Sequence, residues 1–352
     1  MKVILLAQLP PPSGGIASWT KRMQVAELKN NWKSAIVDEK VIGGRDIFGD
    51  NTKKKLSVEI KRCLGIWKNL WKELKDKEAT VVHSSIPAGF TGMLRETFCA
   101  IITKMKGRKF IIHFRCTVPN MVKDGKTLLM FRVLVSLSDA VIALNTPSLI
   151  FTKKYFPNKK VKLIPNFVAV DEKKKNRKYE TEKVTVLYVG GVIREKGCID
   201  ILECAKRTPH INYRLVGAVD KEMKNQEIPS NVILCGETNK EGVQRELNNA
   251  DIFMFVSFFH GEGFSNALAE AMANGLPCVV SDWAANADMI EDKGGYVTLV
   301  HDIDKMAFAI EKLASDAFLR KKMGEWNQMK VEQYYTQDCV TSQYVDLYEE
   351  VL

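Results

Sequence analysis

Residues 260–282 of the chain read HGEGFSNALAEAMANGLPCVVSD, and they give the clearest indication of the fold. It follows the apolar run IFMFVS at 252–257, which is typical of a buried β-strand. A Gly-Glu-Gly turn leads into a helix of small residues that begins near Ser265, and a second apolar strand follows at Cys278–Ser281. Strand, turn, helix and strand in this order predict a β-α-β unit of a parallel sheet.

The same alternation of short apolar runs and amphipathic stretches continues along the whole chain. Continuous β-branched runs separated by helices are typical of parallel sheets covered on both faces. The sequence therefore predicts an α/β protein with two Rossmann-like, doubly wound domains. The expected strands are Val3–Ala7, Ser34–Val37, Thr80–His83, Phe110–Phe114, Ala140–Leu144 and Val161–Ile164 in the first half, and Val184–Val189, Tyr213–Val216, Val232–Cys235, Ile252–Val256, Cys278–Ser281 and Tyr296–Val300 in the second.

A charged and almost apolar-free run, Asp171–Lys183, is expected to be a solvated linker between the two domains. We predict an N-terminal domain over residues 1–168 and a C-terminal domain over 169–334. The last segment, 317–352, has a helical pattern and no strand of its own, so it is expected to pack across a domain surface.

Composition narrows the class of protein further. A chain of 352 residues with 46% hydrophobic and 27% charged residues is not a disordered tail, a collagen or a disulfide-stapled mini-protein. Residues 1–170 hold 30 Lys and Arg against 12 Asp and Glu, a net of +18, while residues 171–352 hold 22 against 30, a net of −8. The eight cysteines form no Cys-x-x-Cys pair, which favours reduced thiols and a cytosolic protein.

Two turns after predicted strands have the composition of phosphate sites, because ligands in open α/β sheets bind beyond the carboxyl ends of the strands. Gly14 and Gly15 in PSGGIASW would let a ligand approach the next helix, or would serve only a tight turn, and the sequence leaves both open. In VGGVIREKG at 189–197, Arg194 and Lys196 suit a diphosphate, unless both are solvated surface residues.

Two further segments carry polar residues at strand ends. His113 and Arg115 close the strand FIIHF; a lone strand histidine is more often a satisfied, half-buried residue, and Arg115 would serve a phosphate or a carboxylate. In the opening stretch, Glu262 lies in the glycine turn and Glu270 lies on the helix that follows. Two carboxylates on either side of a helix N-terminus suit a nucleotide sugar, with hydroxyls at both ends and a diphosphate over the helix.

Taken together, these motifs resemble those of the family-4 retaining glycosyltransferases of the GT-B fold, the glycosyl transferases group 1. The resemblance rests on GEGFSNALAEAMANGLPCVVSD together with PSGGI, PNF at 165–167, REKG at 194–197, LVG at 215–217 and NNADIFMFVS at 248–257. It implies two domains facing across a cleft, with the acceptor in the first domain, the nucleotide sugar in the second, and a C-terminal helix near 335–352 crossing back to the first.

The resemblance also implies roles for individual residues. Glu270 would bind the ribose, Glu262 the transferred sugar, Lys196 the diphosphate with the Gly15 amide, and His113 would lie beside the anomeric centre. The implied donor site is completed by Gly14, Arg194, Gly263, Phe264, Ser265 and Asn266. The anomeric configuration would be retained without a protein nucleophile, and no metal or other cofactor is expected.

Three positions depart from the family pattern. Many members have Arg where this chain has Gly191, so Arg194 is a hypothetical replacement. Asp288 stands where Glu is usual, and Val256 precedes Ser257 where many members have Pro. A separate Asp-x-Asp sequence at 302–304 resembles a metal motif but is better explained as a helix cap.

The positive first half predicts an anionic partner. A helix capped by Thr52 would carry Leu56, Ile60, Cys63, Trp67, Leu70, Trp71 and Leu74 along one stripe with lysines on its other face. The stripe is expected to face the core by default, and the alternative is an anionic membrane surface with Trp67 and Trp71 at the interface. Nucleic acid is not expected, and no run is long enough to span a membrane.

The predicted function is therefore transfer of a sugar from a UDP- or GDP-sugar to a glycan or a polyprenyl-diphosphate-linked acceptor, in surface polysaccharide or glycolipid synthesis. The enzyme would be cytoplasmic and associated with the inner face of the membrane, with Arg115, Trp67 and Trp71 on the side that faces the acceptor or the membrane. Two alternatives remain open: a nucleotide-sugar epimerase of the same fold, and a non-catalytic scaffold that binds polyanions or membranes.

Overall fold

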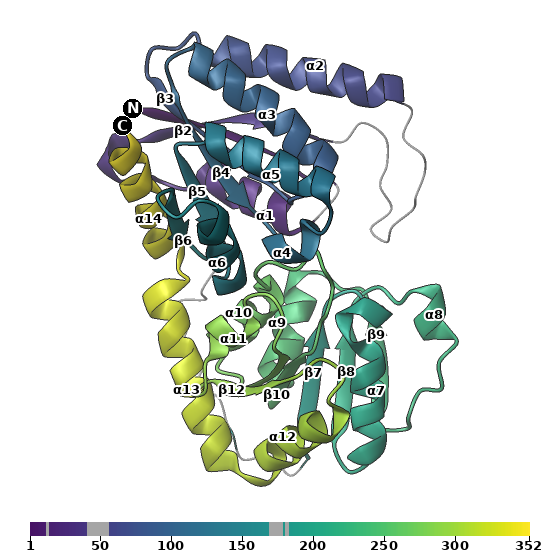
Figure 1. The fold of residues 1–352 in the computed structure, drawn as a ribbon. Coiled ribbons are helices and arrows are strands. Elements are labelled where there is room, and N and C mark those ends of the chain that lie inside the picture. Colours follow the sequence, from purple (N-terminus) through teal and green to yellow (C-terminus); the bar gives the residue numbers. More distant parts are fainter. Residues whose placement is uncertain (12–13, 41–55, 169–178, 180–182) are drawn as a thin grey trace. The chain divides into compact units, whose positions relative to one another are not determined.

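The computed structural model describes residues 1–11, 14–40, 56–168, 179 and 183–352 (Figure 1). The chain divides into two compact units, and each is described by itself. Unit 1 comprises Met1–Phe167 with Gln337–Leu352, and unit 2 comprises Val168–Thr336. Most of the predicted linker 171–183, and the predicted cap Thr52, lie outside the described residues.

Unit 1 is built on a parallel sheet of six strands in the order β2-β1-β3-β4-β5-β6. The chain begins at β1, places β2 on one side of it and β3 to β6 on the other, so the winding reverses between β1 and β3. The strands are β1 Lys2–Ala7, β2 Lys33–Asp38, β3 Ala79–Ile86, β4 Lys109–Phe114, β5 Ala140–Ala143 and β6 Lys160–Leu163. The helices are α1 Gly15–Val25, η1 Lys29–Asn31, α2 Leu56–Glu73, α3 Phe90–Met105, α4 Val118–Met121, α5 Gly125–Leu137, α6 Thr146–Tyr155 and α14 Gln337–Val351.

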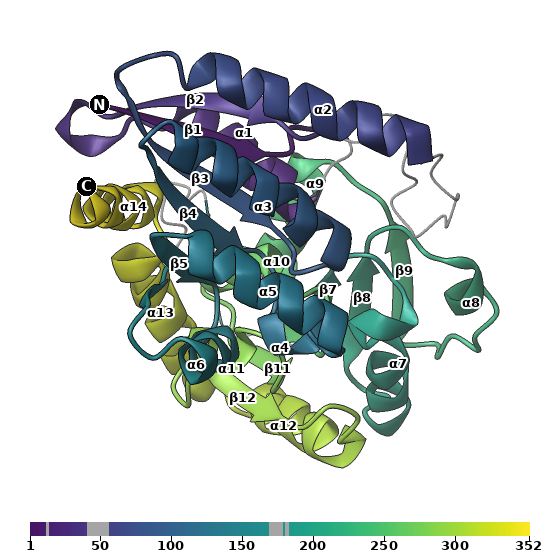
Figure 2. The same ribbon diagram turned by 45° about the horizontal axis from the view of Figure 1, so that its top comes forward.

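The alternation of side chains along β1 divides the core of unit 1 into two layers. Ile4 and Leu6 face a cluster that includes residues of α2, α3 and α5. Val3 and Leu5 face the opposite cluster, which includes residues of α1 and of the C-terminal helix α14. Figures 1 and 2 show α2, α3 and α5 side by side over one face of this sheet.

Unit 2 repeats the architecture with the order β12-β11-β10-β7-β8-β9, and its winding reverses between β7 and β10. Its strands are β7 Thr185–Val189, β8 Asn212–Val216, β9 Val232–Gly236, β10 Ile252–Phe255, β11 Cys278–Ser281 and β12 Gly295–Thr298. Its helices are η2 Arg194–Lys196, α7 Cys198–Arg207, α8 Lys221–Lys224, α9 Lys240–Asn249, α10 Asn266–Ala273, α11 Asn286–Ile290, α12 Ile303–Ser315 and α13 Ala317–Tyr334. The prediction of two parallel, doubly wound α/β sheets is confirmed.

The predicted stripe of helix α2 is wrong in part. Its buried face consists of Ile66 and Leu70, continued by Leu74 just after the helix, with Trp67 partly buried against the same core. Leu56 and Ile60, which the stripe prediction assigned to the core, are 75% and 52% exposed. The reason is geometric: the seven predicted residues cover an arc of about 100°, and the core takes up only one edge of it, over the second half of the helix.

None of the helices in the described part of the chain has both the length and the apolar composition that crossing a lipid bilayer requires.

Candidate active site

The reversal point of unit 2 brings two predicted site residues together. Lys196 follows β7 and Glu262 follows β10, and β7 and β10 are neighbours in the sheet. The Lys196 ammonium forms an ion pair with the Glu262 carboxylate, and both side chains are largely buried. The ammonium also lies 4.9 Å from the centre of the Phe259 ring. Such reversal points are where doubly wound sheets bind their ligands.

The loop that carries Lys196 depends on glycine. Gly197 has a φ of 77° and lies against the backbone of the segment after β10, so that a Cβ atom there would stand 2.2 Å from the Val256 carbonyl oxygen. The Phe258 amide donates to the Glu195 carbonyl at 2.9 Å. The two loops are therefore joined by backbone contacts beneath the Lys196–Glu262 pair.

We expect Gly197→Ala to destabilise the protein by about 2 kcal/mol or more, because alanine pays about 1–2 kcal/mol in the left-handed region and its Cβ meets a carbonyl. Gly236→Ala is the matched control: its φ is 72°, but a Cβ there meets no atom within 4 Å. Urea unfolding of both variants separates the two effects. Equal losses of stability would show that the contact with Val256 is not restrictive.

Two side-chain hydrogen bonds fix the backbone of the loop that carries Glu262. The Trp283 indole donates to the Phe259 carbonyl at 2.8 Å, and the Ser281 hydroxyl donates to the Ser257 carbonyl at 2.6 Å. The Glu262 amide donates to the Phe259 carbonyl at 2.9 Å, which closes a turn. The Glu262 carboxylate is thereby placed by its own backbone, and Lys196 pairs with it from the neighbouring loop.

Helix α10 begins directly after this loop. The Ser265 side chain accepts from the Leu268 amide at 3.1 Å and caps the helix, so its oxygen has a structural use. Glu270 lies on the next turn and is half-buried. The Phe264 side chain is buried and packs edge-on against Tyr335, with 5.3 Å between ring centres, so only its backbone faces outward. Asn266 and the buried Gly263 flank the cap.

Arg194 and Lys196 have different partners and different exposure. Arg194 is about half exposed, and its guanidinium lies 2.5 Å from the Glu222 carboxylate on α8. At Gly191, where many members of the family have Arg, the backbone carbonyl accepts a hydrogen bond from the Tyr188 hydroxyl at 2.8 Å. The departure at Asp288 lies on the short helix α11, where its carbonyl accepts from Lys330 at 3.1 Å.

In unit 1, the predicted glycine pair opens helix α1 after β1. Gly15 is its first residue, and both glycines are exposed. The φ of Gly14 is 177°, a conformation that any residue adopts, and a Cβ at either glycine meets no atom within 4 Å. Glycine is therefore not required at either position by packing against the described residues. Pro12 and Ser13 of the same motif lie outside the described residues.

His113 is fully buried and belongs to a polar cluster beneath α1 and α14. Its Nδ1 lies 3.1 Å from Nε2 of His83 on β3, and His83 Nδ1 lies 2.7 Å from the Tyr348 hydroxyl on α14. Arg115 Nη1 lies 3.2 Å from His113 Nε2, and its guanidinium stacks over Trp19 at 4.7 Å. Both ring nitrogens of His113 thus have partners within the fold, and its predicted place beside the anomeric centre stays a prediction.

The donors and acceptors in this cluster have a definite order. A guanidinium only donates, so the closer contact of Arg115 makes His113 Nε2 an acceptor. Burial and the Arg115 charge lower the pKa of both histidines, that of His83 to about 3, so both rings are neutral. His113 Nδ1–H then donates to His83, and His83 Nδ1–H donates to Tyr348. A hydrogen bond from the His113 ring to a sugar would require Arg115 to move.

Sequence reasoning did not find His83 or Tyr348. The available signal was a histidine in each of two successive apolar strands, VVHSSI and FIIHF. Tyr348 lies 265 positions from His83 and carried no signal of proximity.

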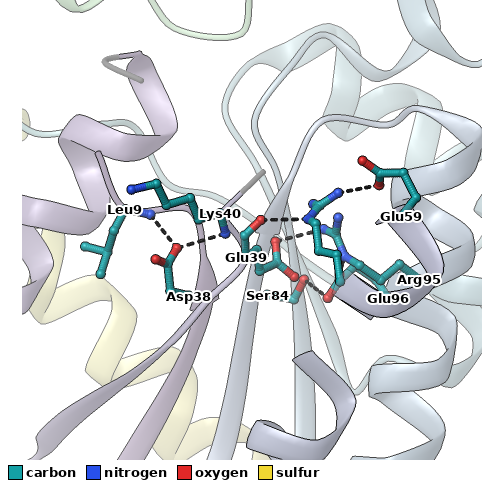
Figure 3. Close-up of polar contacts among 9 residues, drawn as sticks. Leu9, Asp38, Glu39, Lys40, Glu59, Ser84, Arg95 and Glu96 are labelled. Atoms are coloured by element: carbon teal, nitrogen blue, oxygen red, sulfur yellow. Dashed lines mark hydrogen bonds and ion pairs between the residues drawn. The ribbon is translucent and has the colours of Figure 1, made fainter. Parts of the chain in front are cut away.

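A second buried polar cluster in unit 1, also unpredicted, lies where β2 ends (Figure 3). The Arg95 guanidinium donates to Glu39 at 2.8 Å and to Glu96 at 2.7 Å, and the Ser84 hydroxyl donates to Glu96 at 2.7 Å. Arg95, Glu39 and Glu96 are all at least nine-tenths buried. Burial and the nearby Glu96 raise the pKa of Glu39 well above its ordinary value.

Within the described residues, no group of three or more His, Cys, Asp or Glu side chains is placed to hold a metal ion. The Asp302 carboxylate of the Asp-x-Asp sequence accepts from the Lys305 amide at 3.1 Å and caps α12, as predicted.

Two doubly wound units of this kind define the GT-B class of fold, and solved structures of that class superpose on nearly the whole chain. Sucrose-phosphate synthase from Thermosynechococcus elongatus has a TM-score of 0.75 at 15% identity, over 99% of this chain and 98% of that one. Anabaena HepE in complex with UDP and glucose has a TM-score of 0.73 at 14% identity, over 99% and 100%.

Residues 169–329 match the family model of the glycosyl transferases group 1, in agreement with the resemblance seen in the sequence. The capsular polysaccharide biosynthesis glycosyltransferase CapM of Staphylococcus aureus is 23% identical over 198 residues, which are 52% of this chain and 51% of CapM. N-acetyl-alpha-D-glucosaminyl L-malate synthase of Bacillus anthracis is 25% identical over 296 residues, 77% of this chain and 74% of that enzyme. The chain thus spans about half the length of the first relative.

Proposed function

We propose that the protein is a glycosyltransferase that moves a sugar from a nucleotide-diphosphate sugar to a glycan or lipid-linked acceptor. The observation that carries this proposal is the Lys196–Glu262 pair at the reversal point of unit 2, next to the N-terminus of α10. A cation, a carboxylate and a helix N-terminus at one place suit the diphosphate and the hydroxyls of such a donor.

The comparisons support the substrate classes. Anabaena HepE was solved with UDP and with UDP-glucose, which favours UDP as the first nucleotide to test here. Relatives are described as acting in capsular polysaccharide and lipopolysaccharide core biosynthesis, which favours an acceptor of the cell surface. Two more are described as an alpha-glucosyltransferase and an alpha-N-acetylglucosaminyltransferase. Because the common UDP-hexoses are α-linked, these names favour retention.

The proposed chemistry needs no protein nucleophile. When the bond between the anomeric carbon and the diphosphate breaks, negative charge develops on the leaving diphosphate. The Lys196 ammonium and the amides at the start of α10 would stabilise that charge, and Glu262 would hold the sugar hydroxyls. Glu270, one turn into α10, would hold the ribose. We propose further that no metal is required and that the reaction takes place on the cytoplasmic side.

We expect Glu270→Ala to abolish transfer and donor hydrolysis while leaving the fold intact, because the ribose carboxylate is lost from a half-buried site. The measurement is release of UDP from a panel of UDP-sugars, together with the thermal-shift response to UDP. Glu241→Ala, an exposed glutamate in the first turn of α9, is the matched control. Unaltered turnover of Glu270→Ala would contradict the proposed donor site.

A further inference from the structure

Helix α3 presents a continuous apolar face to the solvent. Five large side chains, each between 38% and 69% exposed, follow one another at spacings of three or four residues: Phe90, Leu94, Phe98, Ile101 and Met105. At 100° per residue these positions fall within an arc of about 80°. The core of unit 1 takes the opposite side of α3, through Met93 and Ala100.

Helix α2, which lies beside α3 in both ribbon views (Figure 2), presents a second such face. Leu56, Ile60, Leu64 and Trp71 are between 39% and 75% exposed and again share an arc of about 80°. The partly buried Trp67 contacts Phe98 of α3, with 4.8 Å between ring centres, and so joins the two faces. We call these nine exposed residues the apolar stripe.

Lysines border the apolar stripe on α2. Lys61, Lys68 and Lys72 are exposed at positions next to the apolar arc. The acids of the same helix are committed elsewhere: Glu59 pairs with Arg62 at 2.6 Å, and Glu73 pairs with Lys2 at 3.0 Å. From the end of α3, the Lys106 ammonium stands 3.7 Å from the centre of the Trp71 ring. The charged side chains that border the apolar stripe and face the solvent are therefore cationic.

We propose that the apolar stripe is a docking surface for an anionic phospholipid bilayer, with its side chains in the interface and the bordering lysines at the lipid phosphates. Single exposed apolar residues are ordinary, but two adjoining helix faces of this length are not. An apolar helix face bordered by lysines has the composition of an interfacial membrane contact. A second copy of the chain fits less well, because a symmetric contact through this face would bring its lysines toward one another.

This inference does not rest on the transferase proposal, and it revises the membrane alternative of the sequence analysis. That alternative placed both Trp67 and Trp71 at the lipid interface. In the structure Trp67 packs against the core, whereas Trp71 belongs to the exposed stripe with five residues of α3 that the sequence did not single out.

The test is sedimentation of the full chain with vesicles of phosphatidylcholine alone and of phosphatidylcholine mixed with phosphatidylglycerol. We expect binding to the mixed vesicles that salt weakens. The double variant Leu64→Ser with Met105→Ser should bind the mixed vesicles at least about tenfold more weakly. The double variant Lys68→Glu with Lys72→Glu should lose the preference for anionic lipid. Brominated lipid should quench the fluorescence of bound protein less in Trp71→Phe than in the unaltered protein.

The control is Phe308→Ser with Phe318→Ser, two exposed phenylalanines of unit 2. All variants change exposed residues outside the proposed donor site, and their circular dichroism spectra and urea unfolding midpoints, which report on the fold of both units, should stay close to those of the unaltered protein. The proposal is overturned if mixed vesicles bind no protein, or if the stripe variants bind them as the control does. It is also overturned if the chain dimerises in solution and Leu64→Ser abolishes the dimer, since the stripe would then be a contact between copies.

Discussion

Replacing Lys196 by methionine is expected to lower the rate of sugar transfer by about 10²–10³-fold, the usual loss when one charge-stabilising donor is removed from a reacting centre. Methionine keeps most of the length of the lysine stem and its packing over Phe259. The lost group is the ammonium alone. The lower activity should therefore appear as a slower release of UDP at saturating donor. The midpoint of thermal unfolding should change to a smaller extent.

Arg194→Met is the matched control for this prediction. Arg194 lies two positions before Lys196 on η2, but it is half exposed and its guanidinium is bound to Glu222. We expect this variant to lose less than about tenfold in rate, since an exposed ion pair is worth only about 0–1 kcal/mol. A larger loss in Arg194→Met than in Lys196→Met would show that Arg194 replaces the arginine missing at Gly191, and that the Glu222 pair opens when the donor binds.

Replacing Arg95 by methionine is expected to destabilise unit 1 by about 3–5 kcal/mol, the cost of leaving a buried charge without its partner. Arg95 is the shared partner of Glu39 and Glu96, and in Figure 3 its guanidinium lies between them. Urea unfolding measures the loss. Arg214→Met is the control, because it breaks a bidentate pair with Glu246 that is more exposed and should cost about 1 kcal/mol or less.

The same cluster predicts a dependence on pH. The pKa of Glu39 is raised in the folded state, so between its ordinary value of 4.5 and the raised value the folded protein binds more protons than the unfolded one. Stability from this group is complete below pH 4.5 and is lost as the pH rises through the folded pKa. Glu39→Gln mimics the protonated form, so we expect it to remove this dependence and to cost far less than Arg95→Met. A steeper pH dependence in Glu39→Gln would refute the assignment.

The fold could be predicted because its signal is local. Each strand is four to eight residues long and most contain a short apolar run, and the helices between strands have their own periodicity, so the two six-stranded sheets follow from patterns within short windows. The buried face of α2 was the exception. Its apolar arc is wider than the sheet can cover, and only the packed structure shows that Ile66 faces the core while Ile60 faces the solvent.

The candidate site was predictable to the extent that it follows the strand ends. Lys196 and Glu262 were singled out by their turns, but 66 positions separate them, and only the strand order puts β7 beside β10. His83, Tyr348 and the Arg95 cluster depend wholly on such long-range neighbours. Their residue types are common in any chain, so no local pattern distinguished them.

Helix α14 has a consequence for the order of events during synthesis. Tyr344, Tyr348 and other side chains of α14 fill the core on the α1 side of unit 1, although the rest of that core lies before residue 168. On the ribosome, the first unit must therefore wait with a hydrophobic surface and two histidines uncovered while the whole of the second unit emerges. Unit 2 is continuous in sequence and can fold as it leaves the exit tunnel. Unit 1 is thus synthesised first, but its core is completed only after unit 2 has been made.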